Sequence, residues 1–497
     1  MKSKILYTVF YCLFVLITSC SGQNERASTS YRDQDFPLRI IEPVETIIAD
    51  LKNFIPDYID DEYIPGVGIA LIVNGKVVWT DGFGVKNTIT KDPVTTNTLF
   101  EVASLSKVVT AYMALKLVDE EKISFDMPLH SYLKEDWLPA SVYRDSIKIF
   151  HVASHSSGLG KMSKDIMFKP GSAYYYSANG FVFLKEVMEV VTGESFEELA
   201  QRLVFKPLGM KNSSFTKEKK FIPQTANGHI RALVPTVLFG ILFSILFTLI
   251  FLFGLCIIRF LKNSWYIKRS HTMTFLSITL IFLISPLFVL FGINSIMEFA
   301  WFIAICGFVI LTVFLLLFYF GQRIILRQYP AKKVGQRVLR FLWGVIIIIG
   351  IVLFAGQIRN LPVPRSPDYH VSPAGSLRTS AEDLALFLLE IANPQFLSSE
   401  TSAYLRTPQI KLSENLSWGM GPGILHSEQG YALWQWGQHI DFQSIMIIYP
   451  QHEFGIVICT NNDLLNPDVA VEIAHRALGG KIEPLRRAIH LNFDYRE

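Results

Sequence analysis

Cysteine is scarce in this sequence, with 5 residues in 497. Cys12 lies in an apolar leader, and Cys256 and Cys306 lie in long apolar runs, which leaves Cys20 and Cys459 for the hydrophilic part. Two distant cysteines do not make a disulfide framework, and no Cys/His spacing resembles a zinc site. We therefore expect neither a disulfide-stapled domain nor a metal or other cofactor.

Acidic residues are nearly absent from the middle of the chain. Residues 232–358 contain ten Lys and Arg against one acid, Glu298, which is a local charge of +9. With Lys2 and Lys4 in the leader, the formal charge of +3 leaves −8 for all other residues. The basic pI is therefore no argument for a nucleic-acid partner, because the positive charge is confined to one segment. We expect no nucleic-acid partner.

Four long apolar runs in that segment contain no Asp, Glu, Lys, Arg or His: residues 236–258, 273–293, 299–320 and 341–358. The first three are long enough to cross a bilayer about 30 Å thick, and the fourth is shorter. Intramembrane charges usually mark ion or proton pathways, so their absence argues against a pump or transporter. We expect four transmembrane helices over 232–358, as an anchor in membrane lipid or a surface for a membrane-protein partner. Buried helices of a large soluble fold are the alternative.

The connections between the apolar runs predict an orientation. Lys and Arg are concentrated in the first and third connections, whereas the second, around residues 294–298, has none. By the positive-inside rule, the two basic connections are cytoplasmic, and the parts of the chain before and after the runs are outside.

The N-terminus independently predicts export. Lys2 and Lys4 precede an apolar run over residues 5–17 that is too short to span a membrane, as in a signal peptide over 1–19. Residues 17–20, ITSC, resemble a bacterial lipoprotein signal, which implies lipidation of Cys20; an ordinary signal with an incidental cysteine is the alternative. Residues 20–39 then form a tether. We expect a multi-pass protein of a bacterial cytoplasmic membrane with an extracytoplasmic domain.

Residues 40–231 and 362–497 are enough for one domain interrupted by the insert. Residues 67–73 and 77–80 predict strands joined by Asn74-Gly75, a strong hairpin signal. Further predicted elements are strands at 444–449 and 454–460 and helices at 45–54, 107–118 and 467–478. This order predicts an α/β sandwich whose sheet uses both ends of the chain.

Ser104 and Lys107 form an S-x-x-K motif at the start of the helix predicted over 107–118. Residues i and i+3 share a helix face, so the hydroxyl and the amine can meet. A serine nucleophile needs a neighbouring base, and a desolvated lysine with a lowered pKa can provide one. The helix N-terminus also favours a developing anion. The tetrapeptide alone is weak evidence, because it often arises by chance.

Further segments, in the right order, resemble one known family. They are HSSGLG at 155–160, a PG…YSANG…PLGM block at 170–210, SPAGSLRTSAEDLALFL at 372–388 and GIVICTNN at 455–462. Together with the S-x-x-K, they resemble the class C β-lactamase-like serine hydrolases, which include penicillin-binding-protein-like and esterase members. The resemblance covers most of 40–231 and 362–497. It implies a β-lactamase-like α/β fold, an antiparallel sheet flanked by helices plus a helical region, and an acyl-enzyme on Ser104.

By that resemblance, Tyr176 occupies the tyrosine of the family's Y-x-N motif. Either Lys107 or Tyr176 then takes the proton of the serine, and the residues do not decide which. Ala178 replaces the asparagine of the motif, with Asn179 one residue later. His155 is interpreted as a structural residue of its turn.

The family's third motif, K-T-G or H-x-G, appears here as Gln435-Trp436-Gly437. We expect Trp436, Gly437 and Gln438 at the substrate, where the glycine permits close approach. The backbone N–H of Gln438 would complete an oxyanion hole with that of Ser104. The cation with which family members bind a free carboxylate is missing from this motif. Because a charged hydrogen bond contributes about 1.5–3 kcal/mol, its loss should weaken the binding of substrates that carry a free carboxylate.

These features predict a serine hydrolase that acts on an ester, amide or peptide of the cell envelope. His439 and Arg378 are the candidates to replace the missing cation, so D,D-peptidase, D-aminopeptidase and β-lactamase activities remain alternatives. A membrane-coupled sensor or binding protein for β-lactams or peptidoglycan, with little turnover, is the alternative from a different class.

Overall fold

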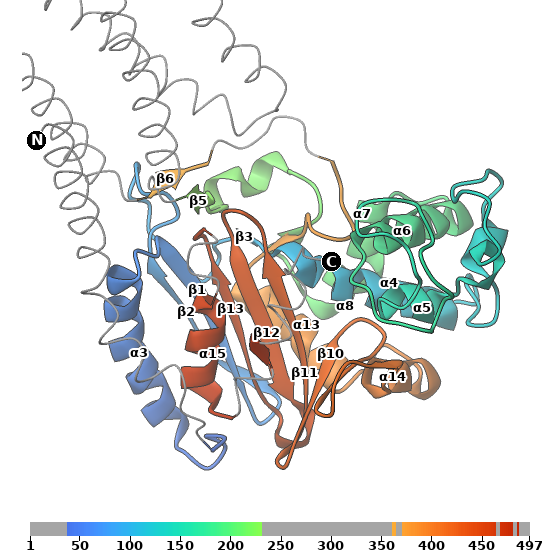
Figure 1. Ribbon diagram of the computed structural model, residues 1–497. Coiled ribbons are helices and arrows are strands. Elements are labelled where there is room, and N and C mark those ends of the chain that lie inside the picture. Colours follow the sequence, from blue (N-terminus) through green and yellow to red (C-terminus); the bar gives the residue numbers. More distant parts are fainter. Residues whose placement is uncertain (1–36, 231–359, 364–369, 464–467, 481–484, 487–497) are drawn as a thin grey trace, which may run out of the picture. The chain divides into compact units, whose positions relative to one another are not determined.

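The computed structural model describes residues 37–230, 360–363, 370–463, 468–480 and 485–486 (Figure 1). The chain divides into two units. The first is formed by Met1–Lys86, Pro93–Ala226 and His370–Glu497, and the second by Asn87–Asp92 and Asn227–Tyr369. The first unit thus combines residues that precede and follow the predicted membrane insert.

An eight-stranded antiparallel sheet lies at the centre of the first unit, in the order β2-β1-β13-β12-β11-β10-β9-β8. The first two strands therefore pair beside the last one, and the prediction that the sheet uses both ends of the chain is confirmed. The strands are β1 (Gly66–Val73), β2 (Lys76–Gly84), β8 (Ile410–Lys411), β9 (Leu416–Trp418), β10 (Gly423–Ser427), β11 (Gly430–Gln438), β12 (Gln443–Tyr449) and β13 (Phe454–Thr460).

The β1–β2 hairpin turns at Asn74 and Gly75, whose φ angles are 51° and 68°. Asparagine and glycine adopt such angles at little cost, which explains the turn at this point. Strands β1, β12 and β13 are buried along nearly their whole length. They are central strands covered on both faces, so their sequences are apolar throughout rather than alternating.

Helices cover both faces of the sheet (Figure 1). Helices α3 (Val44–Asp61) and α15 (Val469–Leu478) pack on one face, and α13 (Ala381–Ala392) packs on the other. Successive strand residues point to opposite faces, and the buried side chains accordingly form two apolar clusters. The larger cluster continues from α13 into a helical region.

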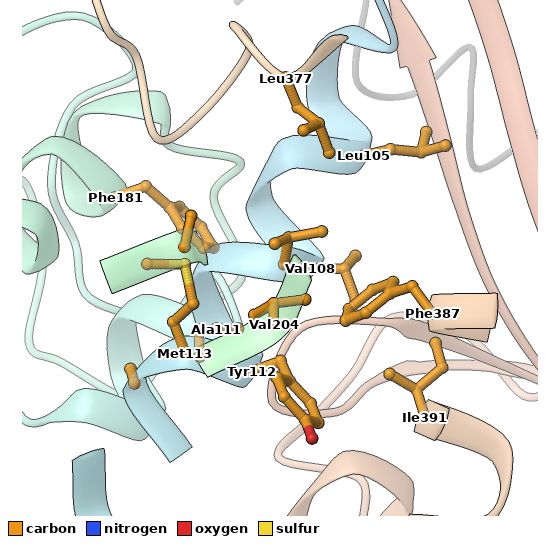
Figure 2. Close-up of a cluster of buried hydrophobic side chains, with 14 of the residues drawn as sticks. Leu105, Val108, Ala111, Tyr112, Met113, Phe181, Val204, Leu377, Phe387 and Ile391 are labelled. Atoms are coloured by element: carbon orange, nitrogen blue, oxygen red, sulfur yellow. The ribbon is translucent and has the colours of Figure 1, made fainter. Parts of the chain in front are cut away.

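Helix α4 (Ser106–Asp119) runs through that larger cluster. Eleven of its 14 residues are buried, which explains why its sequence is apolar on nearly all sides. Figure 2 shows Val108 and Tyr112 of α4 directed at α13, where the rings of Tyr112 and Phe387 have centroids 5.6 Å apart. The surrounding helices are α5 (Ile149–Ala153), α6 (Ala178–Thr192), α7 (Phe196–Ala200), the π-helix η4 (Gln201–Phe205), α8 (Lys206–Leu208) and α14 (Ser399–Arg406).

Short elements complete the described fold. A three-stranded sheet, β3 (Phe100–Glu101), β7 (Arg378–Thr379) and β4 (Ser213–Ser214), joins segments from both sides of the predicted insert. In the second unit, β5 (His229–Ile230) pairs with β6 (Leu361–Pro362). The 3-10 helices are η1 (Ala103–Leu105), η2 (Leu129–Tyr132), η3 (Arg144–Ser146), η5 (Lys219–Gln224) and η6 (Pro450–His452).

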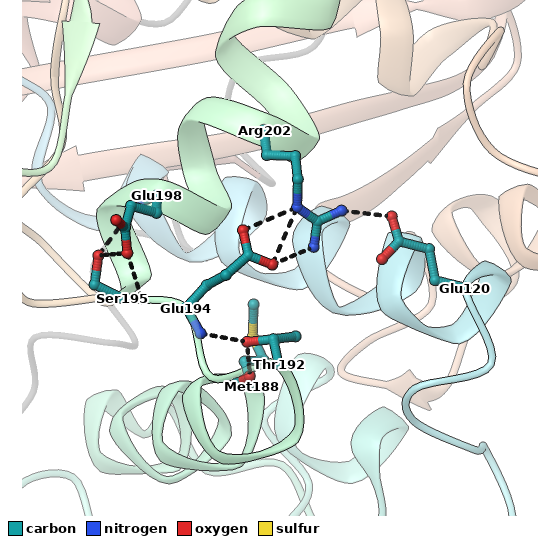
Figure 3. Close-up of polar contacts among 7 residues, drawn as sticks. All are labelled: Glu120, Met188, Thr192, Glu194, Ser195, Glu198 and Arg202. Carbon is teal, nitrogen blue, oxygen red and sulfur yellow. Dashed lines mark hydrogen bonds and ion pairs between the residues drawn. The ribbon is translucent and has the colours of Figure 1, made fainter.

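Arg202 links the end of α4 to the connection between α6 and α7 (Figure 3). Its guanidinium donates to both carboxylate oxygens of Glu194 and, at 2.8 Å, to Glu120, the residue that follows α4. Ser195 and Glu198 form a capping box at the start of α7. These groups are partly exposed, so we expect them to align the helices more than to stabilise the fold.

Several sequence predictions lie outside the described residues. They are the signal peptide over 1–19, the lipidation of Cys20, most of the tether over 20–39 and the whole of the membrane insert over 232–358. Among the residues that the structure does describe, no helix combines the length and the apolar composition needed to cross a membrane.

Replacing Phe387 by alanine is expected to lower the free energy of unfolding by about 3–5 kcal/mol, because it removes a fully buried ring from between α13 and α4. Urea unfolding of the purified protein measures the change. The matched control is Phe396→Ala, since this ring is 45% exposed and its loss should cost no more than about 0.5 kcal/mol. Equal effects of the two substitutions would contradict this packing.

Candidate active site

Ser104 lies in the 3-10 turn η1, directly before α4. The preceding Ala103 has a φ of 47°, which is uncommon for a residue with a side chain. Ser106 holds this turn, since its hydroxyl donates to the Ala103 carbonyl at 2.6 Å and accepts from the Leu377 N–H at 3.1 Å. Surrounding bonds thus maintain a strained backbone beside the serine, as is common at functional sites.

Lys107 lies one turn after Ser104, and its amine reaches the serine. Nζ donates to Ser104 Oγ at 2.9 Å and to the carbonyl of Ala374 at 2.8 Å. The residue is only 3% exposed. Burial, and then the positive charge of Lys161, lower the pKa of Lys107 to about 7. A substantial fraction of the amine is therefore uncharged at neutral pH and able to accept a proton.

Tyr176 completes a three-residue group with Ser104 and Lys107. The Lys107 Nζ is 4.9 Å from the centroid of the tyrosine ring. The phenol is hydrogen-bonded to the side chains of Ser104 and Gln435. Burial raises the pKa of Tyr176 above its usual value, and those two hydrogen bonds offset only part of the effect. The phenol is therefore protonated at neutral pH.

His155 packs against the ring of Tyr176. The two rings stack with centroids 4.1 Å apart, and His155 Nδ1 accepts the backbone N–H of Ser177 at 3.1 Å. Burial, and then the charge of Lys107, hold the pKa of His155 well below its usual value. His155 also has a φ of 58°, which places it in the turn before the tyrosine segment. Its neutral ring orients the phenol of Tyr176 by stacking.

Strand β11 passes very close to the segment that carries the serine. A Cβ at Gly437 would stand 2.1 Å from the carbonyl oxygen of Val102, so this position accepts only glycine. On the neighbouring strand, Ser444 Oγ donates to the same carbonyl at 2.9 Å. The end of β11 and η1 are thus packed backbone to backbone.

The direction of the Gln438 N–H is set by strand geometry. The next residue, His439, donates its N–H to the Phe442 carbonyl at 2.9 Å, toward β12. Because successive N–H groups of a strand point to opposite edges, the N–H of Gln438 points to the other edge. There β10 pairs with β11 only as far as Trp434, and η1 packs beyond it. This N–H can therefore share an oxyanion with that of Ser104.

Gln435, the first residue of the third motif, was not predicted to contact the site but lies within it. Its side chain is 1% exposed, and Nε2 donates to the Tyr176 hydroxyl at 3.3 Å and to the Trp436 carbonyl at 2.9 Å. Its Oε1 has no hydrogen-bond partner among the described residues. The sequence feature that could have indicated this position is the strand period of two, which directs Gln435 and Gly437 to the same face. A neutral amide thus lies where the family motif has a cation.

Neither candidate for a replacement cation is directed at Ser104. Arg378 Nη2 pairs with Glu101 Oε2 at 3.0 Å, and His439 Nδ1 meets Glu101 Oε1 at 2.7 Å. Burial raises the pKa of Glu101, but its bonds to His439 and Arg378 hold the pKa below the usual range. Both basic groups are therefore bound to an ionised carboxylate.

Two other residues from the sequence analysis take supporting positions. Asn179 does not replace the missing asparagine, since its Nδ2 donates to the carbonyl of Ser163 at 2.7 Å. Trp436 provides a ring 5.4 Å from that of Tyr176, and it lies in the apolar cluster beneath α3 and α15. Its contribution is packing against the phenol.

The reactivity of Ser104 is expected to rise with pH through about 7 and then to level off. Only the neutral amine accepts the serine proton, and its fraction grows as the pH rises through the pKa of Lys107. Fluorophosphonate labelling rates between pH 5 and 9 measure this profile. Lys161→Gln removes a charge that lowers this pKa, so it should move the midpoint to higher pH.

The control for that experiment is Lys164→Gln in the same loop, because Lys164 lies over the Trp137 ring at 3.9 Å and does not contribute to the Lys107 shift. Labelling that slows as the pH rises through 7, or an equal shift in both variants, would contradict the role of Lys107.

The chain is similar in sequence to known proteins. Residues 51–240 match the Beta-lactamase family model. The chain is 27% identical over 184 residues to a D-aminopeptidase of Gluconobacter oxydans (strain 621H), covering 33% of this chain and 35% of that protein. It is 28% identical over 210 residues to a β-lactamase of Providencia stuartii, covering 38% and 52%. The chain thus spans about a third to a half of these relatives' lengths.

A solved structure shares the fold. The octameric penicillin-binding protein homologue from Pyrococcus abyssi superposes with a TM-score of 0.55 at 18% identity, covering 89% of this chain and 77% of that one. The expected β-lactamase-like α/β fold is confirmed. Together, the matched segment, the fold and the S-x-x-K group relate this chain to the β-lactamase and penicillin-binding-protein-like serine hydrolases.

Proposed function

We propose that this chain is a membrane-bound, extracytoplasmic serine hydrolase that forms an acyl-enzyme on Ser104 and acts on an ester or amide of the cell envelope. The observation that carries the chemistry is the 2.9 Å contact between Lys107 Nζ and Ser104 Oγ. A buried amine with a pKa near 7 is suited to activate a hydroxyl nucleophile.

In the proposed reaction, Lys107 takes the proton of Ser104 as Oγ attacks the substrate carbonyl. The N–H groups of Ser104 and Gln438 stabilise the tetrahedral oxyanion. As the carbon–oxygen or carbon–nitrogen bond breaks, the leaving group receives a proton through the Tyr176 hydroxyl, which Lys107 replenishes. Water then attacks the acyl carbonyl and gives its proton to the pair Tyr176 and Lys107. The ester bond to Ser104 breaks, Oγ recovers a proton from Lys107, and the acid is released.

The pKa directions favour Lys107 over Tyr176 as the base. The phenol has a raised pKa, and only a neutral amide, Gln435, lies beside it. A cation there would stabilise a phenolate, whereas an amide does so much less. Tyr176 then acts as a protonated relay between the amine and the leaving group.

The polar groups around Ser104 support a substrate without a free carboxylate. Gln435 offers no charge, and Glu101 neutralises Arg378 and contacts His439. The relatives carry the names D-aminopeptidase and β-lactamase, which keeps amide bonds within the proposed substrate class. Placement at the membrane rests on the four apolar runs and the leader of the sequence.

A second candidate function is a membrane-coupled sensor that is acylated but turns over slowly. The replacement of the family's asparagine by Ala178 supports it, because Asn179 bonds to Ser163 instead of the site. The two candidates differ in the fate of the acyl-enzyme, which a hydrolase releases quickly and a sensor retains, and so kinetics separate them.

Ser104 is expected to be the residue labelled by a fluorophosphonate probe, and Ser104→Ala should abolish labelling. Ser106→Ala is an unsuitable control because Ser106 holds the strained turn, so Ser131→Ala, on an exposed turn, serves instead. Absence of Ser104-dependent labelling would refute the hydrolase proposal. If Ser104 is labelled but the unlabelled protein gives only a single burst of product from an ester substrate, without steady turnover, the sensor would be favoured.

Turnover of p-nitrophenyl butyrate is expected to exceed that of a chromogenic cephalosporin, which carries a carboxylate. Gln435→Lys should raise kcat/KM for the cephalosporin relative to the ester by roughly 10- to 100-fold, since a charged hydrogen bond contributes about 1.5–3 kcal/mol. Rapid cephalosporin hydrolysis by the wild-type protein would show that the missing cation does not select the substrate.

A further inference from the structure

Four ionisable side chains gather at the end of β11, beside the Ser104 group. Glu101 Oε2 binds Arg378 Nη2 at 3.0 Å, and Glu101 Oε1 meets His439 Nδ1 at 2.7 Å. Burial, and then the charge of Glu101, raise the pKa of Asp441 to about 6, while His439 and Arg378 act in the opposite direction. Glu101 thus holds one guanidinium, that of Arg378, and one imidazole, that of His439, within a partly buried cluster.

The cluster is built into the backbone around the site. Glu101 lies in β3, three residues before the serine, and Arg378 lies opposite it in β7. A Cβ at Gly375 would stand 3.1 Å from His439 Nε2, so the glycine allows the imidazole to approach closely. The adjacent carbonyl, that of Ala374, accepts the Lys107 amine. His439 is thus held between Glu101 and the segment that backs Lys107.

His439 is also the residue directly after the proposed oxyanion donor. It opens the turn between β11 and β12, where its N–H bonds to the Phe442 carbonyl. At the tip of this turn Ile440 is 46% exposed, whereas Phe442 is buried in the larger apolar cluster. The bond from the imidazole to Glu101 adds a side-chain tie between this turn and the strand that leads into η1.

We propose that the Glu101–His439 pair positions the oxyanion hole, by holding the Gln438 N–H at the correct distance from the Ser104 N–H. The pair joins the two segments that supply the two donors, and it acts through the backbone without touching the substrate. Its catalytic effect rests on the proposed function of Ser104, whereas its anchoring of the turn does not.

The test compares two substitutions at His439. His439→Leu removes the donor to Glu101, and His439→Asn keeps an N–H close to the place of Nδ1. Loss of one oxyanion donor typically lowers kcat by about 10²–10³-fold. Displacement of a donor should therefore lower kcat for p-nitrophenyl butyrate at least 10-fold in His439→Leu, with KM changed less than threefold. The rate of fluorophosphonate labelling should fall in parallel, and His439→Asn should restore most of both.

The structural control is Asp50→Asn, which breaks a partly buried ion-pair group with Arg39 and Arg476 on another part of the fold. It should lower thermal stability without changing kcat or labelling. Unchanged kcat in His439→Leu, or a loss that Asp50→Asn reproduces at equal loss of stability, would overturn the proposal.

Amide hydrogen exchange separates this proposal from the proposed function. Peptides covering residues 437–443 should exchange faster in His439→Leu than in the wild type, and Asp50→Asn should leave them unchanged. If the wild-type protein is not labelled at Ser104, the proposed function fails and so does the catalytic role of the pair, whereas faster exchange would still support the anchoring. Unchanged exchange would refute the anchoring whether or not the protein is active.

Discussion

Activation of Ser104 across its hydrogen bond with Lys107 Nζ requires an amine that is both buried and uncharged for part of the time. Removing an ammonium ion from water costs several kcal/mol unless its charge is compensated or lost. Here α4 is enclosed on nearly all sides by apolar side chains, and the carbonyl of Ala374 accepts a second N–H. The packing of the helical region therefore determines the basicity of the amine, and the chemistry of Ser104 depends on it.

The same packing requires that distant parts of the sequence fold together. Ser104 belongs to the first half of the chain, whereas Gly437 and Ser444, which contact the carbonyl just before it, belong to the second half. The sheet β3–β7–β4 fastens the two halves close to the serine. An insertion between the halves leaves the site intact because none of these elements is interrupted, and the first unit reflects this arrangement.

Local patterns in the sequence predict the parts of the fold that depend on local chemistry. Asn74-Gly75 predicts its hairpin, and the apolar residues after Lys107 predict a buried helix, because turn geometry and helix burial are encoded within a few residues. The contact of Glu101 with His439 joins residues 338 positions apart, and no period or spacing encodes such a pair. Gln435 lies between these cases, since strand alternation indicates its face but not its bond to Tyr176.

The distribution of charge around Ser104 explains how the site can function without a cation in its third motif. A cation near Gln435 would lower the pKa of both Lys107 and Tyr176. With a neutral amide there, burial and Lys161 supply the shift at Lys107, and Tyr176 keeps its proton. In the proposed mechanism, proton abstraction and proton delivery thus belong to two different groups. The nearby basic groups, Arg378 and His439, bind Glu101, and this supports the proposal that the acyl group of the substrate is uncharged.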